Sequence, residues 1–200
     1  MEIITDIDQL SDAWFKLRIG SIGGSTIAQA TANGQARTTL MYRLAGEILS
    51  GKKYEGRTTP VMQMGIDLEP EARQWYEYAT GNKVTQVALV RLTPHKHCSP
   101  DGLIGDGGMT QIKCVIPSTF AKVVCEDRVP PEYKKQLQWE MFISEREWND
   151  FTCYCQPIEN PIFIKRMVRD DKFIKELNAD CDKFIDEMLA IVEKVRAYGT

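Results

Sequence analysis

The sequence predicts an α/β (α+β) fold, with helices and strands interspersed along 200 residues. Two long segments, about 60–80 and 170–197, carry apolar residues three and four positions apart, which predicts amphipathic helices. Between them, the glycine-rich stretch 99–114 is typical of a β-hairpin, two short strands joined by a turn. A chain of this length suits one domain with a sizeable core, so we expect residues 1–200 to form a single domain.

The N-terminal part is predicted to be mainly helical. Helical spacing of apolar residues predicts one helix over 6–18, with Asp6 as its N-cap, and another over about 38–50. The stretch 18–28 is predicted to be a glycine-containing loop that leads into a helix N-terminus, where free backbone N–H groups favour an anion. The basic stretch 52–57 is predicted to be a loop.

The rest of the chain is predicted to alternate strands with helices. We expect the helix over 170–197 to pack against the domain rather than to carry function. The remaining predicted elements are a strand over 83–92, helices over 117–126 and 130–143, and strands over 150–156 and 161–168.

Composition favours a soluble, cytoplasmic protein. No apolar run approaches a membrane span, the N-terminus lacks the basic region of a signal peptide, and six irregularly spaced cysteines favour reduced thiols. The net charge of −3 argues against a surface coated with basic residues. It does not exclude DNA binding, because a ring or cleft can gather Lys and Arg inside while acids cover the outside.

The hairpin brings together residues suited to metal-dependent chemistry. Asp101 stands at the start of its first strand, and Gln111 and Lys113 lie two apart on the second, so both point to one face. A carboxylate, a second metal-ligand position and a lysine then converge on one small volume. Mg²⁺ prefers oxygen ligands and often binds phosphate as well, and a lysine can hold or polarise an attacking water.

This arrangement resembles the PD-(D/E)xK nucleases. Their Pro-Asp pair corresponds to Pro100-Asp101, and their Asp or Glu, any residue, Lys corresponds to Gln111-Ile112-Lys113. Position 111 departs from the family pattern, which has Glu here. The resemblance implies a central mixed β-sheet flanked by helices, the restriction-endonuclease-like core of that superfamily.

Four blocks, in order, are similar to the lambda-exonuclease (YqaJ-type) branch of this superfamily, the phage recombination exonucleases. The blocks are residues 14–18 with 23–25, residues 65–73, the hairpin motif, and residues 131–138. The resemblance implies that Arg18 and Ser25 bind a 5′-phosphate end and that Glu69 is an extra active-site carboxylate. It also implies that Tyr133 and Gln136 line the site.

By the same resemblance, Asp101, position 111, the Ile112 carbonyl and Glu69 would hold two Mg²⁺ ions, with Mn²⁺ as an alternative, while Lys113 orients the attacking water. The implied enzyme digests one strand of linear duplex DNA from a 5′-phosphorylated end and leaves a 3′ single strand. Implied partners are a homotrimeric ring of this chain and a single-strand annealing protein. The resemblance also implies that the enzyme is encoded by a phage or prophage and is located in the cytoplasm of a bacterial host.

Gln111 leaves two interpretations open. Either the natural chain is a degenerate nuclease that only binds DNA ends, or Glu was replaced to trap substrate in an otherwise active enzyme. Because Asp101, Glu69 and Lys113 all remain, we favour the engineered variant.

Cysteine and histidine suggest two other metal centres. Iron–sulfur relatives of these nucleases need cysteines on both sides of the core, and none precedes Cys98 here, so that class is set aside. A zinc site from His95, His97, Cys98 and one of Cys153 or Cys155 is allowed by residue type, although loop histidines and core thiols are the commoner arrangement.

Overall fold

A mixed four-stranded sheet forms the centre of the computed structural model, which describes residues 1–54 and 59–198. The strands follow the order β4-β5-β6-β7, with β5 and β6 parallel and the outer pairs antiparallel. Their bounds are β4 Gly102–Ile104, β5 Gly108–Cys114, β6 Trp148–Tyr154 and β7 Ile162–Val168. The predicted central mixed sheet flanked by helices is thus confirmed.

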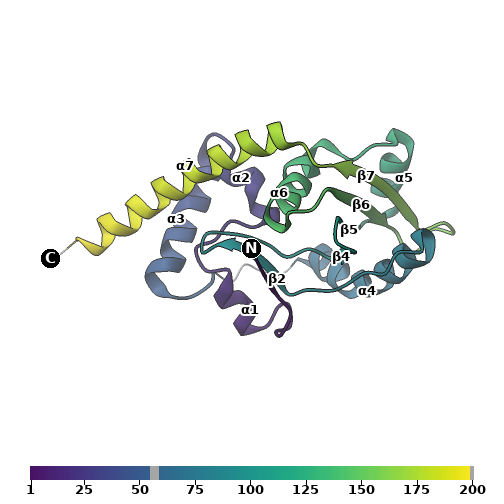
Figure 1. Ribbon diagram of the computed structural model, residues 1–200, viewed down its shortest axis with the longest axis horizontal. Coiled ribbons are helices and arrows are strands. Elements are labelled where there is room, and N and C mark those ends of the chain that lie inside the picture. Colours follow the sequence, from purple (N-terminus) through teal and green to yellow (C-terminus); the bar gives the residue numbers. More distant parts are fainter. Residues whose placement is uncertain (55–58, 199–200) are drawn as a thin grey trace.

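Helices cover the sheet and extend away from it (Figure 1). The helices are α1 Asp12–Leu17, α2 Gly24–Ala30, α3 Gln35–Ser50, α4 Pro60–Thr80, α5 Pro117–Glu126, the 3₁₀ turn η1 Pro131–Tyr133, α6 Lys134–Ser144 and α7 Asp171–Arg196. Helix α4 packs on β5 and β7, whereas α5 and α6 pack on β6. The C-terminal end of α7 projects beyond the rest of the molecule, with α3 beside it.

A second, three-stranded antiparallel sheet stands beside the first. Its strands are β1 Glu2–Ile4, β2 Leu89–Thr93 and β3 Lys96–Cys98. Helix α6 packs against both β2 and β3 and also against β6, so it joins the two sheets. Most of α6 from Leu137 onward is buried for this reason, and Trp139 at its centre donates from Nε1 to the carbonyl of His97, 3.1 Å away.

Several predicted boundaries are wrong near the N-terminus. The helix predicted over 6–18 begins only at Asp12, and Ser11 rather than Asp6 is its N-cap, accepting from the Trp14 N–H at 3.2 Å. Leu10 has φ of 66°, a left-handed conformation that no helix interior allows. Of the basic loop predicted over 52–57, residues 55–57 lie outside the described residues.

Two of the three-residue strands, β1 and β3, are elements that the sequence does not predict. Strands β1 and β3 are too short to show a period of two, and the strand predicted over 83–92 begins only at Leu89. Helix α4 has the bounds that its pattern predicts, because Thr59 and Pro60 mark its start and Gly81, in the left-handed region with φ of 70°, marks its end. Among the residues described, no helix is long and apolar enough to span a membrane.

Candidate active site

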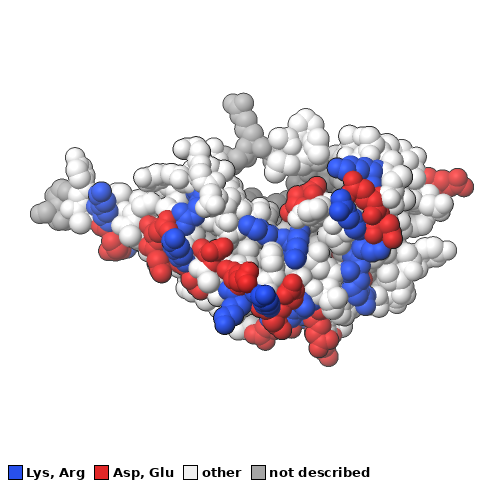
Figure 2. Space-filling view, turned by 90° about the horizontal axis from the view of Figure 1, so that it is seen from above, with Lys and Arg blue, Asp and Glu red and all other residues white. Residues whose placement is uncertain are grey.

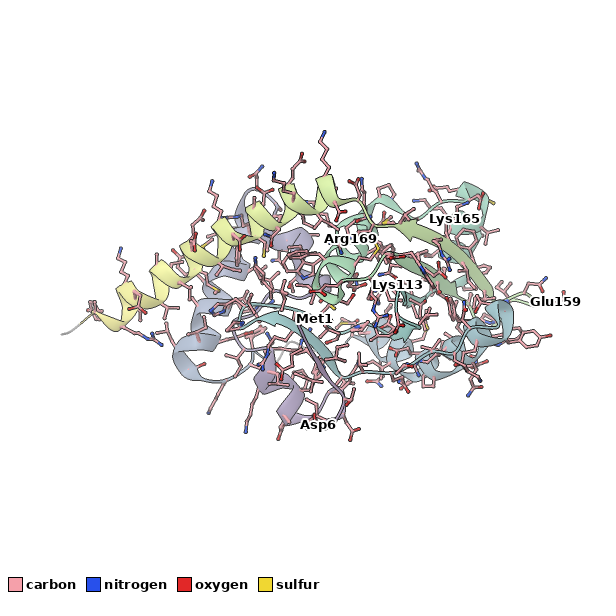
Figure 3. All side chains as sticks on the ribbon, in the orientation of Figure 1. Met1, Asp6, Lys113, Glu159, Lys165 and Arg169 are labelled. Atoms are coloured by element: carbon pink, nitrogen blue, oxygen red, sulfur yellow. The ribbon has the colours of Figure 1, made fainter. Side chains whose placement is uncertain are left out.

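A groove with a volume of about 570 Å³ lies between α4 and the hairpin. Figure 3 shows Lys113 well inside the outline of the molecule, where β5 and α4 approach each other. Six residues predicted for the active site line this groove: Glu69, Asp101, Gln111, Ile112, Lys113 and Tyr133. The structure therefore brings together residues that are up to 64 positions apart in the sequence (133 − 69 = 64).

The groove exists because β4 is shorter than β5. Pairing between the two strands ends at Gly102 and Thr110, so from Gln111 onward no strand in the described part of the chain pairs with that edge of β5. Asp101, just before β4, occupies the open side, and its Oδ2 accepts from the Ile112 N–H at 2.6 Å. A strand residue directs its N–H and C=O to the same side, so the Ile112 carbonyl faces this position too.

Asp101 and Gln111 contact each other directly. The amide Nε2 of Gln111 donates to Oδ2 of Asp101, while its buried Oε1 has no hydrogen-bond partner within the described chain. Burial, and then the charge of Glu69, raise the pKa of the Asp101 carboxyl to about 8. The groove thus gathers side-chain oxygen atoms that have too few hydrogen-bond donors and too little positive charge around them.

Arg73 holds the second acid of the site, Glu69, close to Asp101. It lies one turn after Glu69 on α4, with Nη2 2.5 Å from Glu69 Oε1, and its Nε donates to the backbone carbonyl of Asp101 at 3.2 Å. Burial raises the pKa of Glu69, and the opposing effect of Arg73 is smaller.

Lys113 is supported by aromatic rings. Its Nζ lies 5.4 Å from the centroid of Tyr133, a cation–π distance, and Tyr133 stacks on Phe151 with centroids 5.1 Å apart. Tyr133 therefore forms part of the groove wall, where its ring contacts the ammonium of Lys113.

The oxygen-rich groove fits a hard divalent cation better than a soft one. Two carboxylates, the unpartnered amide oxygen of Gln111 and the Ile112 carbonyl are the ligand types that Mg²⁺ prefers. Nevertheless, the described residues contain no group of three or more His, Cys, Asp or Glu side chains able to hold a metal. In this groove the carboxylates are Glu69 and Asp101, and position 111 supplies an amide instead.

The zinc site allowed by residue type does not form. His95 Nδ1 pairs with the Gly20 carbonyl at 2.8 Å. Cys98 packs in the core that contains α6 and α7, whereas Cys153 and Cys155 pack in a separate core under α5.

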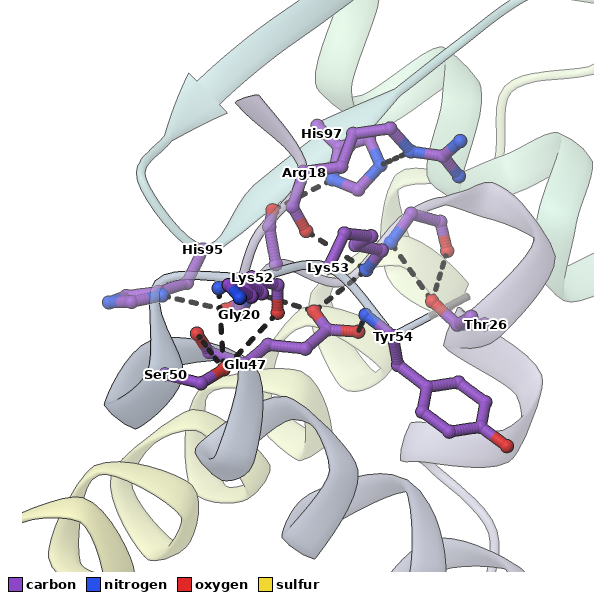
Figure 4. Close-up of polar contacts among 12 residues, drawn as sticks. Arg18, Gly20, Thr26, Glu47, Ser50, Lys52, Lys53, Tyr54, His95 and His97 are labelled. Carbon is purple, nitrogen blue, oxygen red and sulfur yellow. Dashed lines mark hydrogen bonds and ion pairs between the residues drawn. The ribbon is translucent and has the colours of Figure 1, made fainter. Parts of the chain in front are cut away.

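The remaining predicted residues, Arg18, Ser25 and Gln136, lie outside the groove. Arg18 ends α1, with its guanidinium stacked 3.8 Å above the Trp14 ring. Figure 4 shows Arg18 beside His97. Ser25 is exposed in the first turn of α2. Gln136 donates from Nε2 to Glu140 Oε1 at 2.8 Å. Glu140 links Gln136 with α2. It accepts the hydrogen bond from Gln136, and its carboxylate occupies the space that a side chain at Gly24 of α2 would need.

A family model described as the YqaJ-like viral recombinase domain matches residues 13–147, more than half of the chain. The chain belongs to the YqaJ-like viral recombinase domain family. The predicted resemblance to lambda-exonuclease (YqaJ-type) proteins is therefore confirmed, and the four blocks lie within or close to the matched region.

Solved structures agree with this family. The YqaJ-like chain is 32% identical to an alkaline exonuclease, LHK-Exo, from Laribacter hongkongensis, with 93% of this chain and 96% of that chain covered and a TM-score of 0.87. The structure of LHK-Exo in complex with dAMP gives the same values. A phage-related exonuclease from Haemophilus somnus 129PT shares the fold at 14% identity, with 85% and 95% covered and a TM-score of 0.63. No curated protein sequence matches the chain. The family and LHK-Exo together support a nuclease role.

Sequence reasoning missed Glu140 in this YqaJ-like chain. It is 1% exposed, and its second oxygen accepts from Asn149 Nδ2 at 3.0 Å. Burial raises the pKa of its carboxyl to about 7, despite the two amide donors and the charge of Lys113. The sequence feature that could have indicated a buried acid is the position of Glu140 between two apolar residues, Trp139 and Met141, four residues after Gln136.

Glu140→Gln is expected to reduce the pH dependence of stability. The ordinary pKa of this carboxyl is 4.5 and the folded value is about 7, so the folded chain binds more protons between these limits. Stability is therefore lost as pH rises from about 4.5 to 7 and stays low above it. The neutral amide should recover up to roughly 3 kcal/mol at pH 8. Denaturant titrations across pH 5–8 measure this.

Exposed Glu132→Gln is the matched control and should leave the pH profile unchanged. Oδ1 of Asn149, which has no hydrogen-bond partner among the described residues, offers the new amide an acceptor. A Glu140→Gln chain that keeps the original slope would show that another group titrates.

Proposed function

We propose that this chain is a Mg²⁺-dependent 5′-to-3′ exonuclease that digests one strand of linear duplex DNA and leaves a 3′ single-stranded overhang. The observation that carries the proposal is the convergence of Glu69, Asp101, position 111 and Lys113 on one groove, in a member of a recombinase family. Similarity to an alkaline exonuclease supports the reaction class.

The proposed metal ligands are Asp101, Glu69, the side-chain oxygen at position 111 and the Ile112 carbonyl, for two ions of Mg²⁺ or alternatively Mn²⁺. When bound, such ions activate a water and neutralise charge that develops on the phosphate. The Lys113 ammonium, held beside the Tyr133 ring, orients the attacking water and stabilises negative charge on the phosphoryl oxygens. Arg73 keeps Glu69 and the Asp101 backbone in position.

Arg18 and Ser25 are proposed to bind the terminal 5′-phosphate, and Gln136 to contact DNA near them. A guanidinium binds phosphate through two parallel hydrogen bonds, which fixes the end without reading its bases. Figure 2 shows acidic and basic side chains interspersed on one face of the molecule. DNA binding would therefore depend on a local group of residues such as Arg18, Ser25 and Gln136 rather than on overall charge.

We propose that Gln111 impairs catalysis, since a neutral amide supplies no charge to the metal site. The alternative is a non-catalytic protein that binds DNA ends. The hydrogen bond from Gln111 Nε2 to Asp101 favours this alternative, because an amide donor there satisfies the carboxylate without any metal. A Glu at position 111 cannot make that contact when ionised.

The proposed assembly is a homotrimeric ring that delivers its 3′ strand to a single-strand annealing protein, in the cytoplasm of a bacterial host. A ring encloses DNA, which is compatible with a net charge of −3.

Strand polarity tests the proposed function. The Gln111→Glu chain with Mg²⁺ should release mononucleotides from a 5′-labelled strand at once, while a 3′ label on the same strand persists until late. In parallel, sucrose-gradient sedimentation or light scattering measures the mass of the assembly and so tests the proposed trimer. Early loss of the 3′ label would contradict the proposed direction, and cutting of circular duplex would contradict an exonuclease.

A further inference from the structure

We propose that His97 is a positioning residue that orients the guanidinium of Arg18 for the terminal phosphate. The inference rests on the proposed function, because it takes Arg18 as the group that binds the 5′ end. His97 lies on β3, 79 positions from Arg18 and four before Asp101, and it touches no part of the groove described above.

The hydrogen bonds of His97 define its tautomer. Arg18 Nε donates to His97 Nε2 at 3.0 Å, so Nε2 carries no proton. His97 Nδ1 therefore holds the ring proton and donates to Ser21 Oγ, 2.7 Å away. Both ring nitrogens are used, and the imidazole has one orientation.

The imidazole is neutral and rigidly held. His97 is 2% exposed, and burial together with the charges of Arg18 and Lys53 keeps its pKa well below the ordinary value. Its backbone N–H donates to the Ile22 carbonyl at 3.1 Å, and its carbonyl accepts from Trp139.

Other contacts complete the support of Arg18. The Trp14 ring lies under the guanidinium, and its Nε1 donates to the Ala88 carbonyl at 2.9 Å. Lys53 Nζ donates to the Arg18 carbonyl at 3.1 Å and pairs with buried Glu47 at 2.8 Å (Figure 4). Arg18 is thus fixed at its backbone, at its ring-stacked face and at Nε.

The two terminal nitrogens of Arg18 remain available. They make no hydrogen bond within residues 1–54 and 59–198, and in Figure 4 they point away from His97 and from the pair of Lys53 and Glu47. This end of the guanidinium is the part that binds phosphate oxygens in pairs. Burial lowers the pKa of Arg18 only to about 10, so it stays charged.

A neutral acceptor suits this task better than a carboxylate. An Asp or Glu at Nε would neutralise the guanidinium and compete with the phosphate, whereas an imidazole fixes the orientation and leaves the charge for the ligand. Gly23 makes room for it: a Cβ there would lie 2.6 Å from His97 Nε2. Gly23 has φ of −106°, which any residue adopts, so the imidazole rather than the backbone requires glycine.

The test measures the preference for a 5′-phosphate over a 5′-hydroxyl. Fluorescence anisotropy with matched duplexes gives both Kd values for the present chain, without catalysis. His97→Leu should reduce the preference about tenfold or more, since it removes a hydrogen bond to a charged group, while affinity for the hydroxyl end stays unchanged. His97→Gln, which restores an acceptor at similar reach, should recover most of the preference.

His95→Leu is the matched control, because His95 bonds the Gly20 carbonyl and does not touch Arg18. Gly23→Ala displaces the imidazole by a different route and should reproduce the selective loss; it decides the question if His97→Leu does not fold. Equal weakening of both ends, or an unchanged preference, would overturn the role of His97. A parent chain without any phosphate preference would instead overturn end recognition in the proposed function.

Discussion

Gln111→Glu is expected to raise Mg²⁺-dependent digestion of linear duplex DNA by at least about a hundredfold, because several kcal/mol of metal-based stabilisation become available. The substitution replaces an amide that donates to Asp101 with a carboxylate that cannot. Three acids, Glu69, Asp101 and the new Glu, would then face one groove. Initial rates with 5′-phosphorylated duplex, with Mg²⁺ and with a chelator, measure the gain.

A second readout separates metal binding from catalysis. Burial and Glu69 already raise the pKa of Asp101 to about 8, so a further carboxylate should destabilise the metal-free chain. Mg²⁺ relieves this repulsion and should raise the Tm of the Glu form far more than that of the present chain.

Asp101→Ala in the Glu background is the control and should abolish both the activity and the Mg²⁺-dependent rise in Tm. A Glu form that binds Mg²⁺ but leaves linear duplex intact would favour the non-catalytic end-binding protein. A Glu form that neither binds Mg²⁺ nor cuts would show that the groove is not the metal site.

Local pattern predicts the parts of this site that depend on one element. Gln111 and Lys113 share a face because side chains on a strand alternate with a period of two. Glu69 lies on a helix whose start is marked by Thr59 and Pro60 and whose end is marked by Gly81. The approach of α4 to the hairpin is not contained in either pattern. Only the resemblance to a known family linked Glu69 with Asp101 before the structure.

Contacts between distant segments were beyond prediction. His97 meets Arg18 across 79 positions, on a three-residue strand that shows no period. Glu140 is buried because α6 lies between two sheets, whereas an isolated amphipathic helix would expose such a residue. The zinc interpretation failed for the same reason: Cys98 and Cys153 both lie on strands, but they pack into different cores.

Arg18→Ala, made in the Gln111→Glu chain, is expected to slow digestion of 5′-phosphorylated ends by about 10²-fold while 5′-hydroxyl ends change little. The guanidinium makes two charge-assisted hydrogen bonds to phosphate in the proposed complex, and each is worth about 1.5 kcal/mol or more. The effect should not vary with the terminal base pair, because phosphate contacts do not read bases. Initial rates on duplexes that differ only in the 5′ group measure it.

Arg18→Lys separates geometry from charge. An ammonium retains the positive charge but cannot stack flat on Trp14 while offering two parallel N–H groups, so most of the loss should remain. Exposed Lys16→Ala, on the same short helix, is the matched control and should leave the ratio of the two rates unchanged. Since Arg18 also packs on Trp14 and His97, damage to the fold would slow both substrates equally. Equal slowing would make Arg18 a structural residue and would move the end-binding site elsewhere on the molecule.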